Sequence, residues 1–273
     1  MPAKRAKPPK RTAPRDARPG SSRASAIGTA PGRVQIARAD RCVIATLDRP
    51  DAANRLDRTM GQTLMELAEA VEDDETVHAL ALRGAGTVFC RGMDDDVDPR
   101  VVETLAALSK PTVAILNGDA FDEGLELALA LDLRVGLAGA RFALTQLTRG
   151  ILPHFGGTQR LPRLIGATHA LPMLLTGDPI DAETAMRLGL VTYFANDRAE
   201  LERLTADLLT TLAARGMLGV RMVKDAVLKG SDMTLEQGIR LEEDLYALLQ
   251  TTADRAEGVR AFLEKRKPLF KGA

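Results

Sequence analysis

The sequence predicts an α/β protein in which a largely parallel sheet is followed by a helical C-terminal portion. Three observations predict this fold class. Short apolar segments alternate with amphipathic stretches between residues 34 and 137, as they do in βαβ units. The segment TVAIL at 112–116 is apolar almost throughout, which is typical of a strand buried on both faces. After residue 142 the pattern favours helices, with one short strand among them.

The first half opens with a strand at 42–47, which ends at the turn signal formed by Pro50 and Asp51. Asp57 then caps a helix that runs to about residue 71, because apolar residues recur along one face of that segment. The elements expected after this helix are strands at 77–82, 88–90, 112–116 and 133–137, and helices at 101–108 and 123–130.

The second half is expected to be mainly helical and shows no internal repeat. The expected helices lie at 156–165, 167–175, 182–188, 198–215, 219–229 and 234–265, with one strand at 191–194.

The composition is that of a folded globular chain and excludes several classes of protein. The 273 residues are 45% hydrophobic and 27% charged, which rules out full-length disorder. No apolar run reaches the roughly 18–20 residues that span a bilayer, so we expect no membrane partner. Cys42, Cys90 and three scattered histidines offer neither a disulfide scaffold nor metal-ligand spacing. Aromatic residues make up only 3% and Trp is absent, so no nucleic-acid partner is expected either.

The net charge of zero conceals a basic N-terminal segment. Residues 1–32 carry eight Lys or Arg, one Asp and six of the 14 prolines. Apart from Met1, Ile27 is the only large aliphatic residue there, so we expect a disordered basic tail. The alternatives for this tail are a polyanion-binding arm, a transit peptide, an extension from an upstream start codon, or a solvated segment of no specific function.

Three junctions between a loop and a helix are rich in glycine. They are FCRGMD at 89–94, NGDAFDEGLELALALD at 117–132 and RGILPHFGGTQRLPRL at 149–164. Glycine lets the backbone approach a ligand closely or adopt a positive φ. The second junction leaves a buried strand and enters a helix, whose first N–H groups have no partner within the helix. Such groups, reinforced by the helix dipole, can stabilise a developing oxyanion.

Glu126 is the candidate proton-moving residue on this helix. It is flanked by Leu125 and Leu127, so we expect its carboxylate to be partly desolvated. Desolvation raises the pKa of a carboxyl group and suits it to general acid–base catalysis. The alternative is ordinary helix-terminus chemistry, in which Asp122 caps the helix and Glu126 is a solvated helix residue.

The motifs of this region resemble those of the crotonase, or enoyl-CoA hydratase/isomerase, superfamily. The stretch KPTVAILNGDAFDEGLELALALD at 110–132 is similar to the family pattern of KP, an apolar strand, NG and a glycine run before ELALA. The later matching stretches are ARFALTQLTRGILPHFGGTQRLPRLIG at 140–166, LLTGDPIDAETAMRLGLV at 174–191 and ADRAEGVRAFLEKRKPLF at 253–270. The resemblance covers about residues 34–270, in order and with matching spacing.

The resemblance implies a crotonase-like spiral of ββα units, which we assign to residues 33–200, and a helical trimerisation region at 201–273. It also implies an enzyme whose partner is an acyl-CoA or carrier-bound thioester, in a homotrimer or a hexamer built as a dimer of trimers. The CoA thioester is then the substrate, and neither a metal nor a further cofactor is expected. We expect a cytoplasmic location, because no signal peptide is recognisable and the two cysteines are unpaired.

Members of the family hold the enolate oxygen of the thioester in an oxyanion hole made of two main-chain N–H groups. By position these groups belong to Met93 in FCRGMD and to Glu123, which stands where the family has the middle glycine of GGG. The two catalytic glutamates of the family's hydratases map onto Glu126 and Gln146. The loop residues assigned to substrate binding are Arg91, Gly92, Asp94, Gly124, His154 and Phe155.

Gln146 is the departure that bears most directly on the reaction. An amide cannot act as a general acid or base, although it can hold a water or a substrate oxygen. With one carboxylate, Glu126 has to activate the water at Cβ and also deliver the proton at Cα. Three hypotheses follow: an enoyl-CoA hydratase or isomerase, an acyl-thioester decarboxylase or dehydratase of a biosynthetic pathway, and a non-catalytic CoA-binding protein.

Two carboxylates replace glycines of the family at the start of the same helix. Asp122, as an N-cap, is expected to accept a hydrogen bond from the first helical turn and to compete there with the thioester oxygen. Glu123 either supplies a second catalytic carboxylate or complements the positive end of the helix.

The surrounding loops depart from the family as well. Four aspartates lie between residues 94 and 98, and they would weaken the binding of CoA phosphates unless they point to solvent. The alternatives are a solvated acidic loop and an unusual acyl carrier. His154 and Phe155 replace small residues, and the histidine either packs or titrates near neutral pH beside the acyl pocket. Cys90 is expected to be a small core residue.

Overall fold

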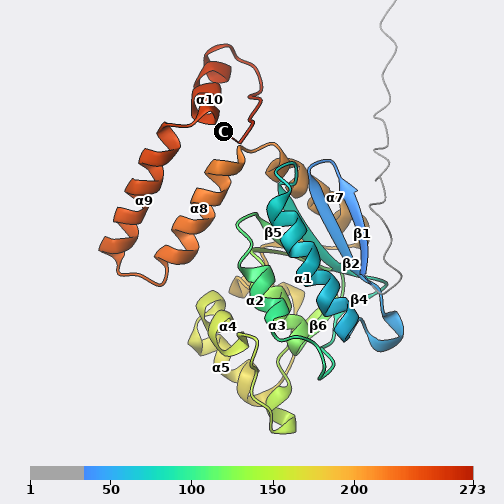
Figure 1. Ribbon diagram of the computed structural model, residues 1–273. Coiled ribbons are helices and arrows are strands. Elements are labelled where there is room, and N and C mark those ends of the chain that lie inside the picture. The colour runs from blue at the N-terminus through green and yellow to red at the C-terminus, as the bar shows by residue number, and fades with distance from the viewer. Residues whose placement is uncertain (1–33, 273) are drawn as a thin grey trace, which may run out of the picture.

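The computed structural model describes residues 34–272, so the basic tail expected at 1–32 lies outside the described residues. Figure 1 shows a body of sheets and covering helices, from which the C-terminal helices project. The described strands are β1 Val34–Ala39, β2 Cys42–Leu47, β3 Ala79–Gly84, β4 Val88–Cys90, β5 Thr112–Leu116, β6 Asp119–Phe121, β7 Leu133–Leu137, β8 Arg141–Ala143, β9 Ile180–Asp181 and β10 Tyr193–Ala195. The described α-helices are α1 Arg58–Asp73, α2 Arg100–Ala106, α3 Glu123–Ala130, α4 Gly157–Ile165, α5 Ala167–Thr176, α6 Ala182–Leu188, α7 Arg198–Ala213, α8 Met217–Gly230, α9 Leu235–Gln250 and α10 Ala253–Leu263.

The strands form two sheets. The larger has the order β1-β2-β3-β5-β7-β10, and the smaller has the order β4-β6-β8-β9. Within the larger sheet only β1 pairs antiparallel, with β2, and within the smaller only β9 does so, with β8. The predicted largely parallel sheet is therefore confirmed.

The spiral arises because consecutive strands divide between the two sheets. In the pairs β3–β4, β5–β6 and β7–β8, the first strand joins the larger sheet and the second joins the smaller. After the first two pairs the chain returns through α2 and α3, and α2 packs between α1 and α3. The ββα spiral predicted from the resemblance is thus confirmed.

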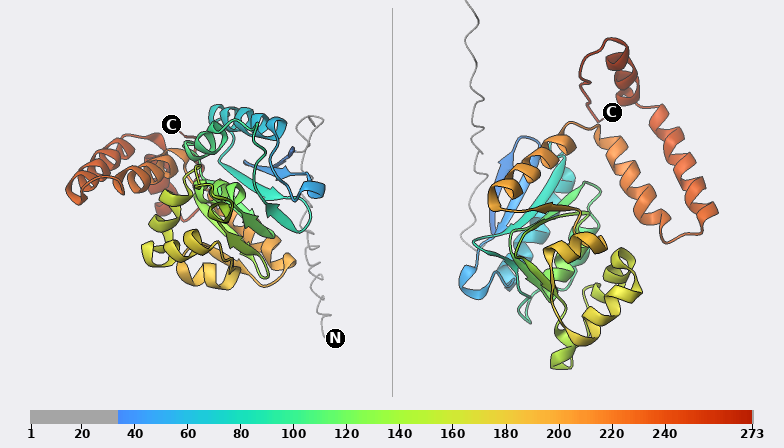
Figure 2. Two further views of the ribbon diagram at one scale, coloured as in Figure 1. Left: turned by 90° about the horizontal axis from the view of Figure 1, so that it is seen from below. Right: turned by 180° about the vertical axis from the view of Figure 1, so that it is seen from behind.

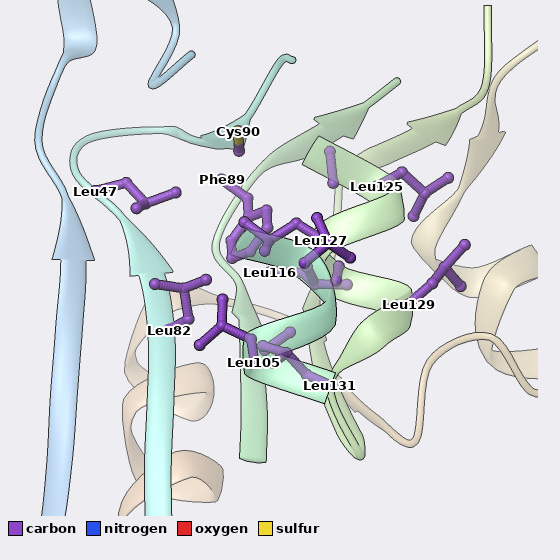
Figure 3. Close-up of a cluster of buried hydrophobic side chains, with 14 of the residues drawn as sticks. Leu47, Leu82, Phe89, Cys90, Leu105, Leu116, Leu125, Leu127, Leu129 and Leu131 are labelled. Carbon is purple, nitrogen blue, oxygen red and sulfur yellow. The ribbon is translucent and has the colours of Figure 1, made fainter. Parts of the chain in front are cut away.

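The alternation of side chains along β5 divides the core into two layers. Ala114 and Leu116 belong to the cluster beneath α1–α3, whereas Val113 and Ile115 belong to the cluster beneath α7. Figure 3 shows leucines of the strands meeting those of α3 in the first layer. Each fully buried leucine stabilises the fold by about 2 kcal/mol relative to exposure. This packing makes α3 a rigid element on which a site can be built.

The C-terminal helices differ in how they meet the body. α7 covers the second face of the larger sheet through Leu201, Leu209 and Ala213, so it packs on the body although it lies beyond the division expected at residue 200. α8 and α9 form an antiparallel pair that extends from the body in Figures 1 and 2, and Lys224 of α8 joins it to the body through Lys110 O at 3.0 Å and Asp132 at 2.7 Å. No helix within residues 34–272 is long and apolar enough to cross a membrane.

Two features of the secondary structure were not predicted correctly. The strands β1, β6, β8 and β9 were missed, and the last three have only two or three residues, too few to show a period of two. The single helix expected at 234–265 is wrong. α9 ends at Gln250, and the Thr252 side chain accepts a hydrogen bond from the N–H of Arg255 and caps the separate helix α10.

Candidate active site

The loop that follows β4 carries Met93 past the start of α3. Gly92 has a φ of +114°, which a side chain rarely permits. The N–H of Leu56 donates to Gly92 O at 3.1 Å, and the N–H of Asp94 donates to Leu56 O at 2.8 Å. These bonds hold residues 92–94 against the segment before α1, so the Met93 N–H is placed by backbone contacts on both of its sides.

The start of α3 packs directly on this region. A Cβ on Gly124 would lie 2.1 Å from Cys90 O, so only glycine permits the observed approach. Glu123 is the first residue of α3, and its N–H has no partner within the helix. Its carboxylate Oε2 accepts a hydrogen bond from the Met93 N–H at 3.3 Å. The structure therefore brings together the two residues assigned to the oxyanion hole, with the Glu123 side chain on the amide of Met93.

Glu126 lies one turn further along α3 and is fully buried. Its Oε1 accepts hydrogen bonds from the N–H groups of Phe155 and Gly157 at 2.9 and 2.8 Å. Its Oε2 accepts from Gln146 Nε2 at 3.0 Å. Burial raises the pKa of Glu126, although the two main-chain donors oppose this shift. The alternative of a solvated helix residue is wrong, and the raised pKa suits proton transfer.

Gln146 begins the short 3₁₀ turn Gln146–Arg149 and is also fully buried. While its Nε2 donates to Glu126, its Oε1 meets no hydrogen-bond donor within residues 34–272. A buried acceptor without a donor costs free energy, so its position calls for an explanation. The Gln146 amide oxygen and the Glu126 carboxylate together present acceptors suited to one small donor, such as a water molecule.

Asp122 does not cap α3 with its side chain, contrary to the expectation from the sequence. Its φ and ψ are 53° and −126°, so the backbone does not place the carboxylate over the first turn of the helix. The carboxylate instead accepts from Thr145 N–H at 2.6 Å, Thr145 Oγ1 at 2.8 Å and Arg149 Nη1 at 3.0 Å. It therefore fastens the turn that carries Gln146 and does not compete for the N–H groups of α3.

Substitutions at Asp122 should separate the value of these bonds from the cost of the backbone conformation. Asp122→Ala removes the bonds and keeps the unfavourable positive φ, so we expect a loss of about 2–3 kcal/mol in the free energy of unfolding. Asp122→Gly removes the same bonds but relieves the backbone, so it should cost about 1 kcal/mol less. Urea denaturation measures both values. Equal losses for Ala and Gly would show that the conformation at 122 is not strained.

Most of the acidic loop after Met93 is neutralised by arginines. Two guanidinium groups contact Asp94, and the hydrogen bond from Arg49, followed by that from Arg55, holds the pKa of Asp94 below its ordinary value. This pairing offsets much of the repulsion that the loop would exert on CoA phosphates. The pairs are Asp94–Arg49 at 2.6 Å, Asp94–Arg55 at 3.1 Å, Asp96–Arg58 at 3.7 Å and Asp98–Arg100 at 2.6 Å.

Arg55 was not identified from the sequence. Its guanidinium donates to Arg91 O at 3.3 Å, to Met93 O and to Asp94, so one side chain spans the loop that carries the Met93 amide. No local pattern signals this role, because each contact joins Arg55 to a residue at least 36 positions away. Thr145, which holds Asp122, was missed for the same reason.

The remaining predicted residues lie around the site. Arg91 contacts Asp119 at 3.1 Å, and its guanidinium lies 4.3 Å from the centroid of the Phe121 ring. His154 and Phe155, whose ring centroids are 4.1 Å apart, line a groove of about 750 Å³. The groove runs between the start of α2 and α4 and reaches the turn between α8 and α9. Because the Phe155 N–H bonds Glu126, the groove leads to the loop that holds this carboxylate.

Two further predictions concern groups outside proton transfer. Cys90 is fully buried, and burial raises the pKa of its thiol to about 12, which accords with a core residue. No group of three or more His, Cys, Asp or Glu side chains within residues 34–272 could hold a metal ion.

A ββα spiral with a buried glutamate on the helix beside two candidate oxyanion amides defines a crotonase-type protein. The family model for enoyl-CoA hydratase/isomerase matches residues 39–273, and the chain belongs to this family.

Named relatives and solved structures agree with this assignment. (E)-benzylidenesuccinyl-CoA hydratase of Thauera aromatica is 39% identical over 243 residues, which cover 84% of this chain and 94% of the relative. 2,3-Dehydroadipyl-CoA hydratase of Escherichia coli K12 is 35% identical over 250 residues, which cover 87% and 98%. The crystal structure of enoyl-CoA hydratase from Bacillus anthracis matches with a TM-score of 0.85 at 31% identity, covering 89% of this chain and 100% of that one.

Proposed function

We propose that this protein hydrates a 2-enoyl-CoA thioester with one carboxylate, Glu126, and one positioning amide, Gln146. Membership of the enoyl-CoA hydratase/isomerase family supports acyl-CoA thioester chemistry. The observation that carries the proposal is the buried Glu126–Gln146 contact at 3.0 Å, with no donor to the Gln146 Oε1 among the described residues. This arrangement suits a water that donates one proton to Gln146 Oε1 and the other to Glu126 Oε2.

The proposed reaction uses Glu126 first as a base and then as an acid. Glu126 takes a proton from the water while the water oxygen forms a bond to Cβ. The electrons of the double bond shift toward the thioester carbonyl, which becomes an enolate. The N–H groups of Met93 and Glu123 stabilise that oxygen. Protonated Glu126 then returns the proton to Cα, so that one water has been added across the double bond. The raised pKa of Glu126 favours both steps near neutral pH.

The competing hypotheses predict different products from the same site. A double-bond isomerase uses Glu126 to move a proton between two carbons and adds no water. A decarboxylase or dehydratase starts from a different substrate, and a non-catalytic protein binds the thioester without turnover. The paired Gln146 amide and Glu126 carboxylate favour hydration over isomerisation and decarboxylation, because the amide adds an acceptor for a water that neither of them uses. Dehydration is the reverse of hydration at the same site, so the direction is set by the substrate supplied.

Hydration is tested by incubating the full chain with crotonyl-CoA and following the loss of the enone absorbance. Because two relatives are named for dicarboxylic acyl-CoA substrates, 2,3-dehydroadipyl-CoA belongs in the same assay. A product heavier by one water supports the proposal. A product of unchanged mass identifies an isomerase, and thioester binding without turnover of either compound overturns the proposal.

Gln146→Glu should raise the rate of crotonyl-CoA hydration by roughly tenfold or more, since a general acid–base group contributes about 10²–10⁴-fold. Two carboxyl groups this close cannot both ionise, so one keeps a proton that it can deliver to Cα. Gln146→Ala is the matched control and should lower the rate, because it removes the acceptor for water. Steady-state kinetics measure the hydration rate of both variants. Rates equal to that of the wild type in both would exclude a role for position 146.

We also propose that the protein is a homotrimer located in the cytoplasm. Large apolar side chains are exposed on the projecting helices, including Val223, Val227, Leu235 and Phe262, and such patches on a single chain indicate an interaction surface. The unpaired Cys42 and Cys90 support a reducing compartment. Analytical ultracentrifugation of the full chain tests the assembly, and a monomer at micromolar concentration would contradict it.

A further inference from the structure

The Glu123 carboxylate contacts one of the two amides assigned to the thioester oxygen. Its Oε2 accepts from the Met93 N–H at 3.3 Å, and the residue is only 9% exposed. A Cβ built on Gly92 would lie 2.6 Å from Arg55 Nη1 and 3.0 Å from Glu123 Oε2. The carboxylate and the Arg55 guanidinium therefore lie on the same face of Gly92.

We propose that the Glu123 side chain is an internal ligand of the oxyanion hole, which the thioester carbonyl must displace, and that it thereby sets the affinity of the site. The inference rests on the proposed function, because the hole is the one assigned there to Met93 and Glu123. At 3.3 Å this bond is slightly longer than the roughly 2.7–3.2 Å usual for N–H···O, so it can be exchanged. The displaced carboxylate remains close to Arg55, whose Nη1 already donates to Arg91 O.

The displacement should cost the same free energy in the bound substrate and in the transition state, because the carboxylate has left the Met93 N–H in both. It is therefore a uniform loss of binding, which raises KM and leaves kcat unchanged. Removing the Glu123 side chain should lower KM, raise kcat/KM and leave kcat unchanged.

The test compares the wild-type chain with Glu123→Ala, Glu123→Gln and the control Glu69→Ala. Glu69 is exposed on α1 and does not line the groove, so its removal deletes one negative charge without touching the candidate site. Butyryl-CoA, a saturated thioester that cannot be hydrated, is titrated calorimetrically, and KM and kcat are measured with crotonyl-CoA. Thermal unfolding of each variant confirms folding.

We expect Glu123→Ala to bind butyryl-CoA roughly 10- to 100-fold more tightly, the range of a lost charge-assisted hydrogen bond. Glu123→Gln should gain less, since its amide oxygen can still accept from Met93, and Glu69→Ala should bind as the wild type does. Unchanged or weaker binding by folded Glu123→Ala overturns the inference, as does an equal gain in Glu69→Ala. A large loss of kcat at constant KM would instead make Glu123 a second acid–base group.

The butyryl-CoA titration separates this inference from the proposed function. Tighter binding by Glu123→Ala together with an absence of hydration in the wild type would uphold the internal ligand and reject the hydratase. Hydration by the wild type without a change in the affinity of Glu123→Ala for butyryl-CoA would uphold the hydratase and reject the internal ligand.

Discussion

Glu126→Gln is expected to reduce kcat for crotonyl-CoA hydration by roughly 10³-fold, within the range for loss of a general acid–base group. The amide has a similar shape but cannot take up the proton of water. The fold should survive, because the Gln oxygen can still accept from Phe155 and Gly157. Rotation of the Gln146 amide by half a turn would bring its Oε1 to the new NH₂ group, which can then donate to it. In the wild type this Oε1 has no donor within the described residues.

The matched control is Glu69→Gln, an exposed carboxyl group on α1 outside the groove, which should keep the wild-type rate. Steady-state kinetics measure kcat, and calorimetric titration with butyryl-CoA shows whether binding is retained. More than a tenth of the wild-type rate in Glu126→Gln would exclude this residue as the base.

Gly124→Ala should cost both activity and stability. The added Cβ would lie 2.1 Å from Cys90 O and 2.6 Å from Cys90 C. Both are main-chain atoms, which can move only with a shift of the strand β4. α3 would therefore shift from the loop that carries Met93, and the two candidate oxyanion amides would separate. We expect a fall of about 10²-fold in kcat/KM, the cost of losing one oxyanion donor, and a loss of about 1–3 kcal/mol in the free energy of unfolding.

Gly258→Ala is the matched control, because within residues 34–272 its Cβ would meet just one atom, Phe270 Cε1, at an ordinary contact distance of 3.7 Å. Alanine in the helix α10 should stabilise the chain by up to about 1 kcal/mol and leave activity unchanged. Urea denaturation measures the free energy of unfolding of Gly124→Ala and Gly258→Ala, and kinetics with crotonyl-CoA measure kcat/KM for both variants. If Gly124→Ala kept full activity, the close packing of α3 on β4 would not be what positions the amides.

The fold could be predicted where the signal was local and long enough to repeat. The helix α1 shows apolar residues on one face, and its N-cap Asp57 accepts from the N–H of Met60 as predicted. The strand β5 was recognisable from its apolar residues alone, and all five of its residues are buried. The break between α9 and α10 was missed because the apolar pattern continues across it, and only the side chain of Thr252 restarts the helix.

The residues of the site were predicted more completely than their contacts. Glu126, Gln146, Met93 and Glu123 were selected from motif positions, and the structure places Glu126 beside Gln146 and Glu123 beside Met93. The role expected of Asp122 was wrong, because a capping preference assumes extended backbone at the cap, whereas its φ is 53°.

The sequence by itself determined the fold class, the longer strands and helices, the resemblance to the family, and the placing of Glu126 and Gln146 at its motif positions. These properties depend on residue identity and short-range periodicity, which every segment carries independently of the rest. The tertiary structure decided which groups those side chains meet: Glu123 on the amide of Met93, Asp122 on Thr145, and Arg55 across the loop that carries Met93. Such contacts join residues far apart in the chain, and they exist only once buried packing has brought the ends of β4, β8 and α3 together.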